Sequence, residues 1–206
     1  MEIRERILQQ AEVLFLRNGI KGVSMDNIAA ALSMSKKTLY KAFANKDEIV
    51  QAAMSSHLSK VQANCARISR EAVNSVQKMV LIARWADAQY HEVHPSIVHD
   101  LRKFHPVTWA LFREHQYSFL LAQLIHALRR GITEGVFRTN LDVGVLARLH
   151  LGQVELVFDA ELYPPDQFSA ARIHQSLDEH FLLGIATPYG QQLFAEYQQQ
   201  PTLEYS

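Results

Sequence analysis

The sequence predicts an all-α fold, and three observations support that prediction. Apolar residues recur three or four positions apart along most of the 206 residues, which is the spacing of one buried helix face. Few segments alternate β-branched and polar residues, and no Asn-Gly or Asp-Gly pair joins two such segments as a hairpin turn. Capping residues and prolines divide the chain into helix-sized segments.

Residues 2–18 are expected to form the first helix, and Gly19 follows where a C-cap belongs. Its buried stripe is expected to consist of Ile7, Ala11, Leu14 and Phe15. Because two short helices have too little core of their own, this stripe is expected to brace the two helices that follow.

Residues 24–47 predict two short helices joined by a tight turn. Ser24 is placed to cap the first helix, in which Ile28, Ala29 and Leu32 repeat at helical spacing. The turn is Ser33-Met34-Ser35, and Ser35 is placed to cap the second helix. On this second helix Leu39 and Phe43 lie four residues apart and share a buried face.

The other faces of the second helix carry cations and hydroxyls, at Lys36, Lys37, Thr38, Tyr40 and Lys41. Such groups bind phosphates, and those near a helix N-terminus can reach base edges in a DNA groove. The segment is therefore interpreted as a DNA-binding helix-turn-helix.

The pattern Ile28-Ala29-x5-Ser35-x3-Leu39-Tyr40-x2-Phe43-x2-Lys46-Asp47 resembles the DNA-binding signature of the TetR family of bacterial transcriptional regulators. The resemblance covers roughly residues 3–54. Two positions depart from the family pattern: Ser33 stands where glycine is usual in the turn, and Ala42 stands where a histidine often precedes the phenylalanine. If the backbone at Ser33 is left-handed, a non-glycine residue there costs about 1–2 kcal/mol.

The resemblance implies a ligand-responsive regulator, most often a repressor, that binds a palindromic DNA operator as a homodimer. Lys36, Lys37 and Thr38 would approach base edges or phosphates, and Tyr40, Lys41 and Lys46 would hold the DNA backbone. The residues expected to contact DNA are Ser24, Ser35, Lys36, Lys37, Thr38, Tyr40, Lys41 and Lys46.

The charge distribution gives weak support for a separate N-terminal DNA-binding domain. Residues 1–47 carry eight Lys and Arg against five Asp and Glu, whereas residues 48–206 carry thirteen against sixteen. A basic N-terminal domain suits phosphate binding. We therefore expect a DNA-binding domain at 1–47, followed by a helical effector-binding and dimerisation domain at 48–206.

Seven further helices are expected in the rest of the chain, separated by proline, glycine and loop segments. Their expected ranges are 47–70, 71–92, 96–105, 107–131, 142–160, 167–184 and 189–199. Asn45 is the expected N-cap of the first of them, which is interpreted either as a rigid strut or as a connection that transmits movement.

Aromatic residues gather in the central helices, where the resemblance implies an effector pocket. Trp85, Trp109, Phe112 and His115 are expected to bind an apolar or aromatic small molecule as a set. The alternative for each ring is that it simply fills a helical core.

The resemblance also implies that residues 142–160 and 167–184 pair with their copies in a second subunit. The candidate dimer residues are Leu149, Val154, Phe158, Ile173, Leu177 and Phe181. The alternative is an intramolecular core, and a mixture of the two is expected. Dimerisation is also favoured because a two-fold dimer reads two half-sites about 34–36 Å apart.

Other functional classes find little support in the sequence. His91, His94, His99 and His105 lie near Glu92 and Asp100, but their spacing matches no metal motif, so no metal site is predicted. No nucleophile or nucleotide-binding motif predicts an enzyme, and no cofactor is expected. A lone Cys65, the lack of an apolar leader and the lack of a long apolar run predict a cytoplasmic protein away from membranes.

One alternative from a different class stays open. The chain could be a helical ligand- or partner-binding protein whose helix-turn-helix is degenerate, and Ser33 and Ala42 are the residues that would support that interpretation.

Overall fold

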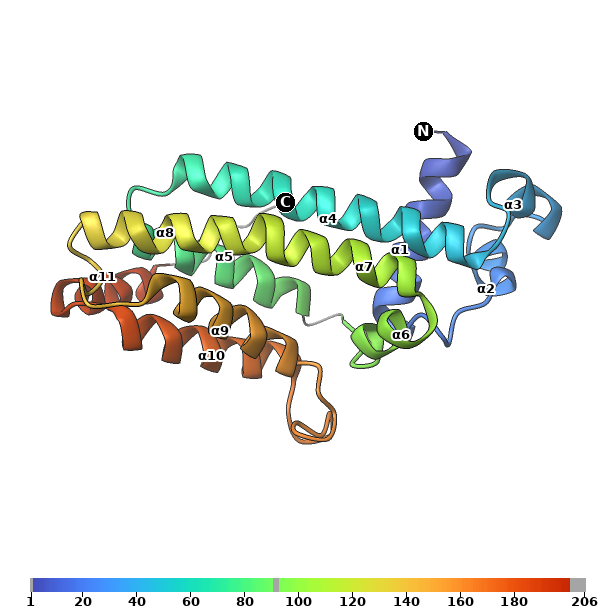
Figure 1. The fold of residues 1–206 in the computed structure, drawn as a ribbon. Coiled ribbons are helices and arrows are strands. Elements are labelled where there is room, and N and C mark those ends of the chain that lie inside the picture. Colours follow the sequence, from blue (N-terminus) through green and yellow to red (C-terminus); the bar gives the residue numbers. More distant parts are fainter. Residues whose placement is uncertain (1, 91–92, 201–206) are drawn as a thin grey trace. The chain divides into compact units, whose positions relative to one another are not determined.

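The computed structural model describes residues 2–90 and 93–200, and these residues form an all-helical protein (Figure 1). Within them β-structure is limited to an isolated antiparallel bridge between Phe137 and Ala186. The predicted all-α fold class is confirmed.

The helices follow the order that the apolar spacing predicts. They are α1 (Ile3–Asn18), α2 (Met25–Ala31), α3 (Lys36–Ala42), α4 (Lys46–Glu71), α5 (Ser75–Tyr90), α6 (Ile97–Phe104), α7 (Pro106–Glu114), a π-helical segment (His115–Leu120), α8 (Leu121–Thr133), α9 (Val143–Leu156), α10 (Ala170–Ile185) and α11 (Pro188–Gln199).

The chain divides into two compact units. The first unit comprises residues 1–61 and 92–115, and the second comprises residues 62–91 and 116–206. The first unit therefore contains the first part of α4 and the helices α6 and α7 in addition to the three N-terminal helices. The predicted functional boundary at residue 47 falls inside this unit and stays a prediction.

The core of the first unit is built where α1 packs against α2 and α3. Ile7, Phe15, Ile28, Leu39 and Phe43 are buried there as predicted, whereas Leu14 and Leu32 of the predicted stripes are only partly buried. Burying these side chains supplies the hydrophobic stabilisation that α2 and α3 are too short to provide alone. The predicted bracing role of α1 is confirmed.

Helix α6 is held to the end of α1 by a buried carboxylate. Asp100 is 3 % exposed and accepts hydrogen bonds from the backbone N–H of Lys21 (2.9 Å) and the hydroxyl of Ser96 (3.1 Å). Burial alone would raise the pKa of Asp100, but these bonds and the neighbouring His99 hold it below its ordinary value. The predicted C-cap Gly19 has φ 73°, and a Cβ there would lie 2.5 Å from the Ser96 hydroxyl.

The second unit is a layered helical bundle around α5. Helix α5 packs against α8, α10 and α11, and α9 lies beside α8 and α10 (Figure 1). The centre of this core contains Val76, Leu128, Phe137, Phe181 and Ile185.

Gly131 allows the closest contact in this core. The ring of Phe137 lies so near the α8 backbone that a Cβ on residue 131 would be 2.1 Å from it. Residue 131 therefore has to be glycine for Phe137 to reach its fully buried position.

The predicted single helix at 107–131 differs from the structure. The helix is interrupted by the π-helical segment His115–Leu120, in which both His115 and Gln116 are buried. A π-helical turn accommodates one extra residue, which shifts the register of the helix faces on its two sides. Apolar spacing at the α-helical period cannot reveal this.

Within the described ranges, no helix combines the length and the apolar character that crossing a bilayer requires.

Candidate nucleic-acid interface

Helix α2 begins with a complete capping box. The Ser24 hydroxyl accepts a hydrogen bond from the backbone N–H of Asn27 (3.2 Å), and the Asn27 side chain accepts one from the backbone N–H of Ser24 (2.8 Å). Two otherwise unsatisfied donors are thereby paired at this end. Ser24 therefore has a structural role as a cap, whereas its expected DNA contact stays a prediction.

The turn between α2 and α3 contains a non-glycine residue in the left-handed region, Ser33, with φ 51°. Its backbone N–H donates to the Ala30 carbonyl (3.0 Å), and that of Met34 donates to the Ala29 carbonyl (3.0 Å). These bonds satisfy carbonyls at the end of α2. Ser33 thus adopts the strained conformation considered in the sequence analysis, and the turn is preserved without glycine.

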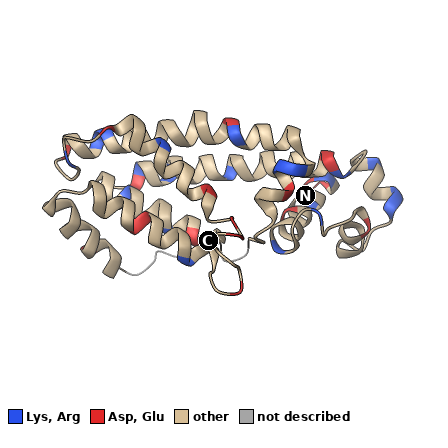
Figure 2. Cartoon of the chain, turned by 60° about the horizontal axis from the view of Figure 1, so that its bottom comes forward, with Lys and Arg blue, Asp and Glu red and all other residues tan. Residues whose placement is uncertain are grey.

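Helix α3 has one buried face and one exposed face. Ser35 caps it by accepting from the backbone N–H of Thr38 (3.1 Å), and Leu39 is fully buried. Lys37 and Lys41 are exposed, and Tyr40 is 51 % exposed. Figure 2 shows where the Lys and Arg residues lie along the chain. The exposed face of α3 therefore presents two cations and a phenol, a composition that suits contact with phosphate.

Lys36 has a partner within the helix-turn-helix. Its ammonium lies 2.6 Å from the carboxylate of Asp26 on α2, and both side chains are more than half exposed. An exposed pair of this kind contributes about 0–1 kcal/mol and is weakened by salt. Lys36 can therefore exchange this partner for a phosphate at little cost.

Lys46 also has a role inside the first unit. Its ammonium donates to the backbone carbonyl of Ile20 (2.5 Å), and burial lowers the pKa of its amine although Asp100 and Asp47 act in the opposite sense. A lysine has three donors, so this bond leaves others for the expected phosphate contact.

Sequence reasoning missed Arg4, which holds the C-terminal end of α3. Its guanidinium donates to the Ala42 carbonyl (2.6 Å), pairs with Glu48 (2.9 Å) and lies 4.1 Å from the centre of the Phe43 ring. Glu48 also accepts from the backbone N–H of Ala44 (2.8 Å). No local pattern signals this role, because Arg4 is distant in sequence from all of its partners.

The residues expected to bind an effector belong to different units. Trp109 and Phe112 stack with ring centres 5.4 Å apart, and His115 is buried, all in the first unit. Burial, together with the neighbouring His57, lowers the pKa of His115. Trp85 belongs to the second unit and is partly buried. The proposed effector set stays a prediction.

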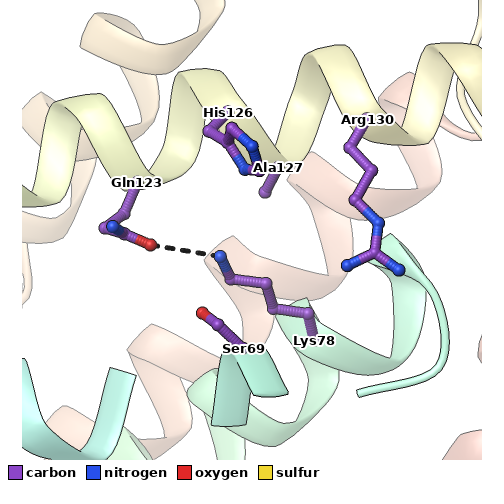
Figure 3. Close-up of a pocket in the computed structure, with 6 residues that line it drawn as sticks. All are labelled: Ser69, Lys78, Gln123, His126, Ala127 and Arg130. Carbon is purple, nitrogen blue, oxygen red and sulfur yellow. Dashed lines mark hydrogen bonds between the residues drawn. The ribbon is translucent and has the colours of Figure 1, made fainter. Parts of the chain in front are cut away.

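A pocket does occur inside the second unit, among residues that sequence reasoning did not select (Figure 3). It is lined by Ser69, Lys78, Gln123, His126, Ala127 and Arg130, and its volume is about 260 Å³. The available sequence signal was Lys78, a lysine in the otherwise apolar run of α5.

The candidate dimer residues differ in exposure. Leu149 is 54 % exposed, Val154, Phe158 and Leu177 are half-buried, and Ile173 and Phe181 are buried. Phe181 also stacks on the ring of His150, with centres 4.1 Å apart. Ile173 and Phe181 therefore fit the alternative interpretation, in which an apolar side chain belongs to the core of its own subunit.

Helix α9 keeps an uncovered apolar stripe. Val145, Leu149, Gly152 and Leu156 repeat at helical spacing, and the three side chains are 59 %, 54 % and 41 % exposed. A Cβ on Gly152 would meet no atom within 4 Å. We call these four residues the α9 stripe.

The histidines near α6 are used as hydrogen-bonding and ionic partners. His94 lies 3.0 Å from the Ser96 hydroxyl, His99 lies 3.6 Å from Asp100, and His105 lies 2.8 Å from Asp47. Across the described residues, no three His, Cys, Asp or Glu side chains are grouped to hold a metal ion. His91 and Glu92 lie outside the described residues.

Comparisons with known proteins agree with this geometry. Residues 7–53 match the family model described as "Bacterial regulatory proteins, tetR family". The chain is 22 % identical to the "Uncharacterized HTH-type transcriptional regulator YvaF" of Bacillus subtilis (strain 168), over 88 % of this chain and 94 % of that protein. It is 23 % identical to the "HTH-type transcriptional repressor KstR2" of Mycobacterium tuberculosis (strain ATCC 25618 / H37Rv), over 70 % of this chain and 74 % of that protein.

A solved structure has the same fold. The tetR-family regulator from Agrobacterium tumefaciens superposes with a TM-score of 0.74 at 18 % identity, covering 89 % of this chain and 97 % of that chain. The relatives are named as transcriptional regulators, which is the class that the sequence predicts in preference to an enzyme.

Proposed function

Because this chain is a transcriptional regulator of the tetR family, we propose that it represses genes as a homodimer that binds a palindromic operator and is released by a small-molecule effector. The observation that carries the proposal is α3, a capped helix with one face buried in the first unit and Lys37, Tyr40 and Lys41 exposed on the other. A bacterial repressor meets its operator in the cytoplasm, so the proposal places the chain there.

The homodimer is supported by the α9 stripe. One short recognition helix reads only a few base pairs, and a two-fold dimer doubles the number of bases read. The stripe is an apolar helix face that the second unit leaves uncovered, and pairing with a copy of itself would remove it from water. Leu149 lies at its centre.

The proposed repression is supported by the relatives, among which KstR2 of Mycobacterium tuberculosis is named a repressor. The alternative of a degenerate helix-turn-helix has less support, because Ser33 keeps the left-handed turn that the missing glycine put in question.

Selection of DNA fragments from the source genome tests the proposal. The purified protein should recover fragments that share one palindromic motif, and recovery should decline at the higher of two salt concentrations because phosphate contacts release counterions. The double variant Tyr40→Ala/Lys41→Ala serves as the matched control and should recover no motif. Equal recovery by the variant, or fragments without a shared motif from the wild type, would contradict the proposal.

A further inference from the structure

We infer that the pocket around Lys78 binds the carboxylate of a small organic anion, and that this anion is the effector. The inference rests on the proposed function, because it assigns a chemical class to the effector of that regulator. It differs from the apolar or aromatic effector expected from the sequence by placing a charged group at a specific residue.

The first argument is the burial of Lys78. This residue is 4 % exposed, and its ammonium donates to the side-chain oxygen of Gln123 (3.2 Å) (Figure 3). No carboxylate of the described residues pairs with it. A buried charge is costly unless an opposite charge and several hydrogen bonds compensate it. One neutral amide satisfies only one of the three donors that an ammonium carries.

The second argument is the charge of the surroundings. Burial lowers the pKa of Lys78, Cys65 acts in the opposite sense, and Arg130 lowers the pKa further. Burial also raises the pKa of the Cys65 thiol, which keeps this side chain neutral. Arg130 adds a second cation, but Glu134 pairs with it at 2.6 Å. The pocket region therefore holds one cation without a compensating anion.

The third argument is the arrangement of the lining residues. Lys78 on α5, Gln123 and His126 on α8, and Ser69 near the end of α4 direct polar atoms toward the same space (Figure 3). The Ser69 hydroxyl donates to the Cys65 carbonyl (2.7 Å), so the two donors that remain on the Lys78 ammonium are the groups that can bind the oxygens of one carboxylate. The single uncompensated ammonium matches one negative charge, which favours a monocarboxylate over a phosphate, with about −1.5 to −2 charges at neutral pH.

The volume limits the size of the ligand. Pockets for drug-sized molecules are about 300–1,000 Å³, and this pocket has about 260 Å³. A compact carboxylate fits this volume, with its apolar part against Ala127 and the aliphatic stems of the lysine and arginine.

Thermal unfolding and calorimetry of the full chain test the inference with three probes, propionate, hexanoate and benzoate, at constant ionic strength. At least one carboxylate should raise the melting temperature of the wild type with saturation, and its uncharged amide should not. In Lys78→Met the same carboxylate should bind at least about tenfold more weakly, the loss expected for a charged hydrogen bond. Lys103→Met, which removes an exposed lysine, is the matched control and should bind normally.

The stability of the unliganded variants separates ligand binding from a structural role. If Lys78 is uncompensated, Lys78→Met should melt at the same temperature as the ligand-free wild type or above it, whereas a structural lysine would lower the melting temperature when removed. Lys78→Gln provides a second variant if the methionine form does not fold. No response to any of the three carboxylates, or equal binding by Lys78→Met, would overturn the inference, and tighter binding of inorganic phosphate would overturn the assignment to a carboxylate.

Operator binding, measured separately, keeps the two proposals distinguishable. If a carboxylate binds but does not release the protein from the selected DNA, the anion-binding site is supported. The assignment of this anion as the effector is then overturned. Failure to select any DNA would count against the proposed function, while the calorimetry still decides whether the pocket binds an anion.

Discussion

The guanidinium of Arg4 lies 4.1 Å from the centre of the Phe43 ring, so the first turn of α1 covers the residue that ends α3. The same side chain donates to the Ala42 carbonyl. The orientation of the candidate recognition helix is therefore fixed by a residue that is not expected to contact DNA.

Arg4→Ala should lower the free energy of unfolding by about 1 kcal/mol, because it removes a cation–π contact and a backbone hydrogen bond at a partly exposed site. Denaturant unfolding measures this. Arg6→Ala, which removes an exposed arginine from the same helix, is the control and should change stability by no more than about 0.5 kcal/mol. Equal effects of the two substitutions would contradict the role of Arg4.

Lys41→Ala should weaken operator binding across sequences and reduce the slope of log affinity against log salt by about 1, because one phosphate contact is lost. The free energy of unfolding of this variant should equal that of the wild type, since the Lys41 side chain is exposed. Lys46→Ala should show the same change in slope and also unfold more easily, because its bond to the Ile20 carbonyl is lost. An unchanged salt slope in both variants would rule out the assigned phosphate contacts.

Ser33→Gly should stabilise the protein by about 0.5–1 kcal/mol, because glycine adopts the observed φ of 51° without steric strain. The gain is reduced by the extra freedom of glycine in the unfolded chain. Ser33→Ala is the matched control, since alanine retains the Cβ. Chemical denaturation of the two variants should show a higher free energy of unfolding for the glycine variant alone.

Leu149→Glu should convert a dimer into a monomer, because a carboxylate at the centre of the α9 stripe would be buried without a partner. Sedimentation velocity measures the change in mass. Val73→Glu places the same charge on another exposed apolar position, 71 % exposed, outside the stripe. A monomeric wild type, or a dimer that survives Leu149→Glu, would exclude the stripe as the interface.

Acid should weaken the attachment of α1 to α4. Burial alone would raise the pKa of Glu12, but hydrogen bonds from His57 (3.2 Å) and Lys60 (2.6 Å) hold it below its ordinary 4.5. A lowered folded-state pKa gives stability that is present above the unfolded-state value and is lost as the pH falls through the folded-state value. Between about pH 5 and 3 the wild type should therefore lose more stability than Glu12→Gln, as urea unfolding at several pH values would measure.

Local features were predictable from the sequence because they depend on neighbours in the chain. Ser24 and Ser35 cap the helices as expected, and the side chain of Asn45 accepts from the backbone N–H of Glu48 (2.9 Å), as an N-cap does. The buried pair Leu39 and Phe43 follows from helical spacing alone.

Features that depend on distant neighbours were not predictable. Lys46 resembled a phosphate ligand in the sequence, but its bond to Ile20 requires the loop after α1 to lie nearby. The pocket around Lys78 combines α4, α5 and α8, so no single segment reveals it. Periodicity also could not divide core from interface on α10, where Ile173 and Phe181 are buried within the unit.

The contact between Gly131 and Phe137 has a consequence for how freely this sequence can change. Any residue other than glycine at position 131 would push a Cβ into the Phe137 ring, whereas an exposed position such as Val73 admits many side chains. Random substitution followed by selection for folded protein should therefore exclude nearly every alternative at residue 131. In this second unit, one of the most restrictive positions is a residue that has no side chain.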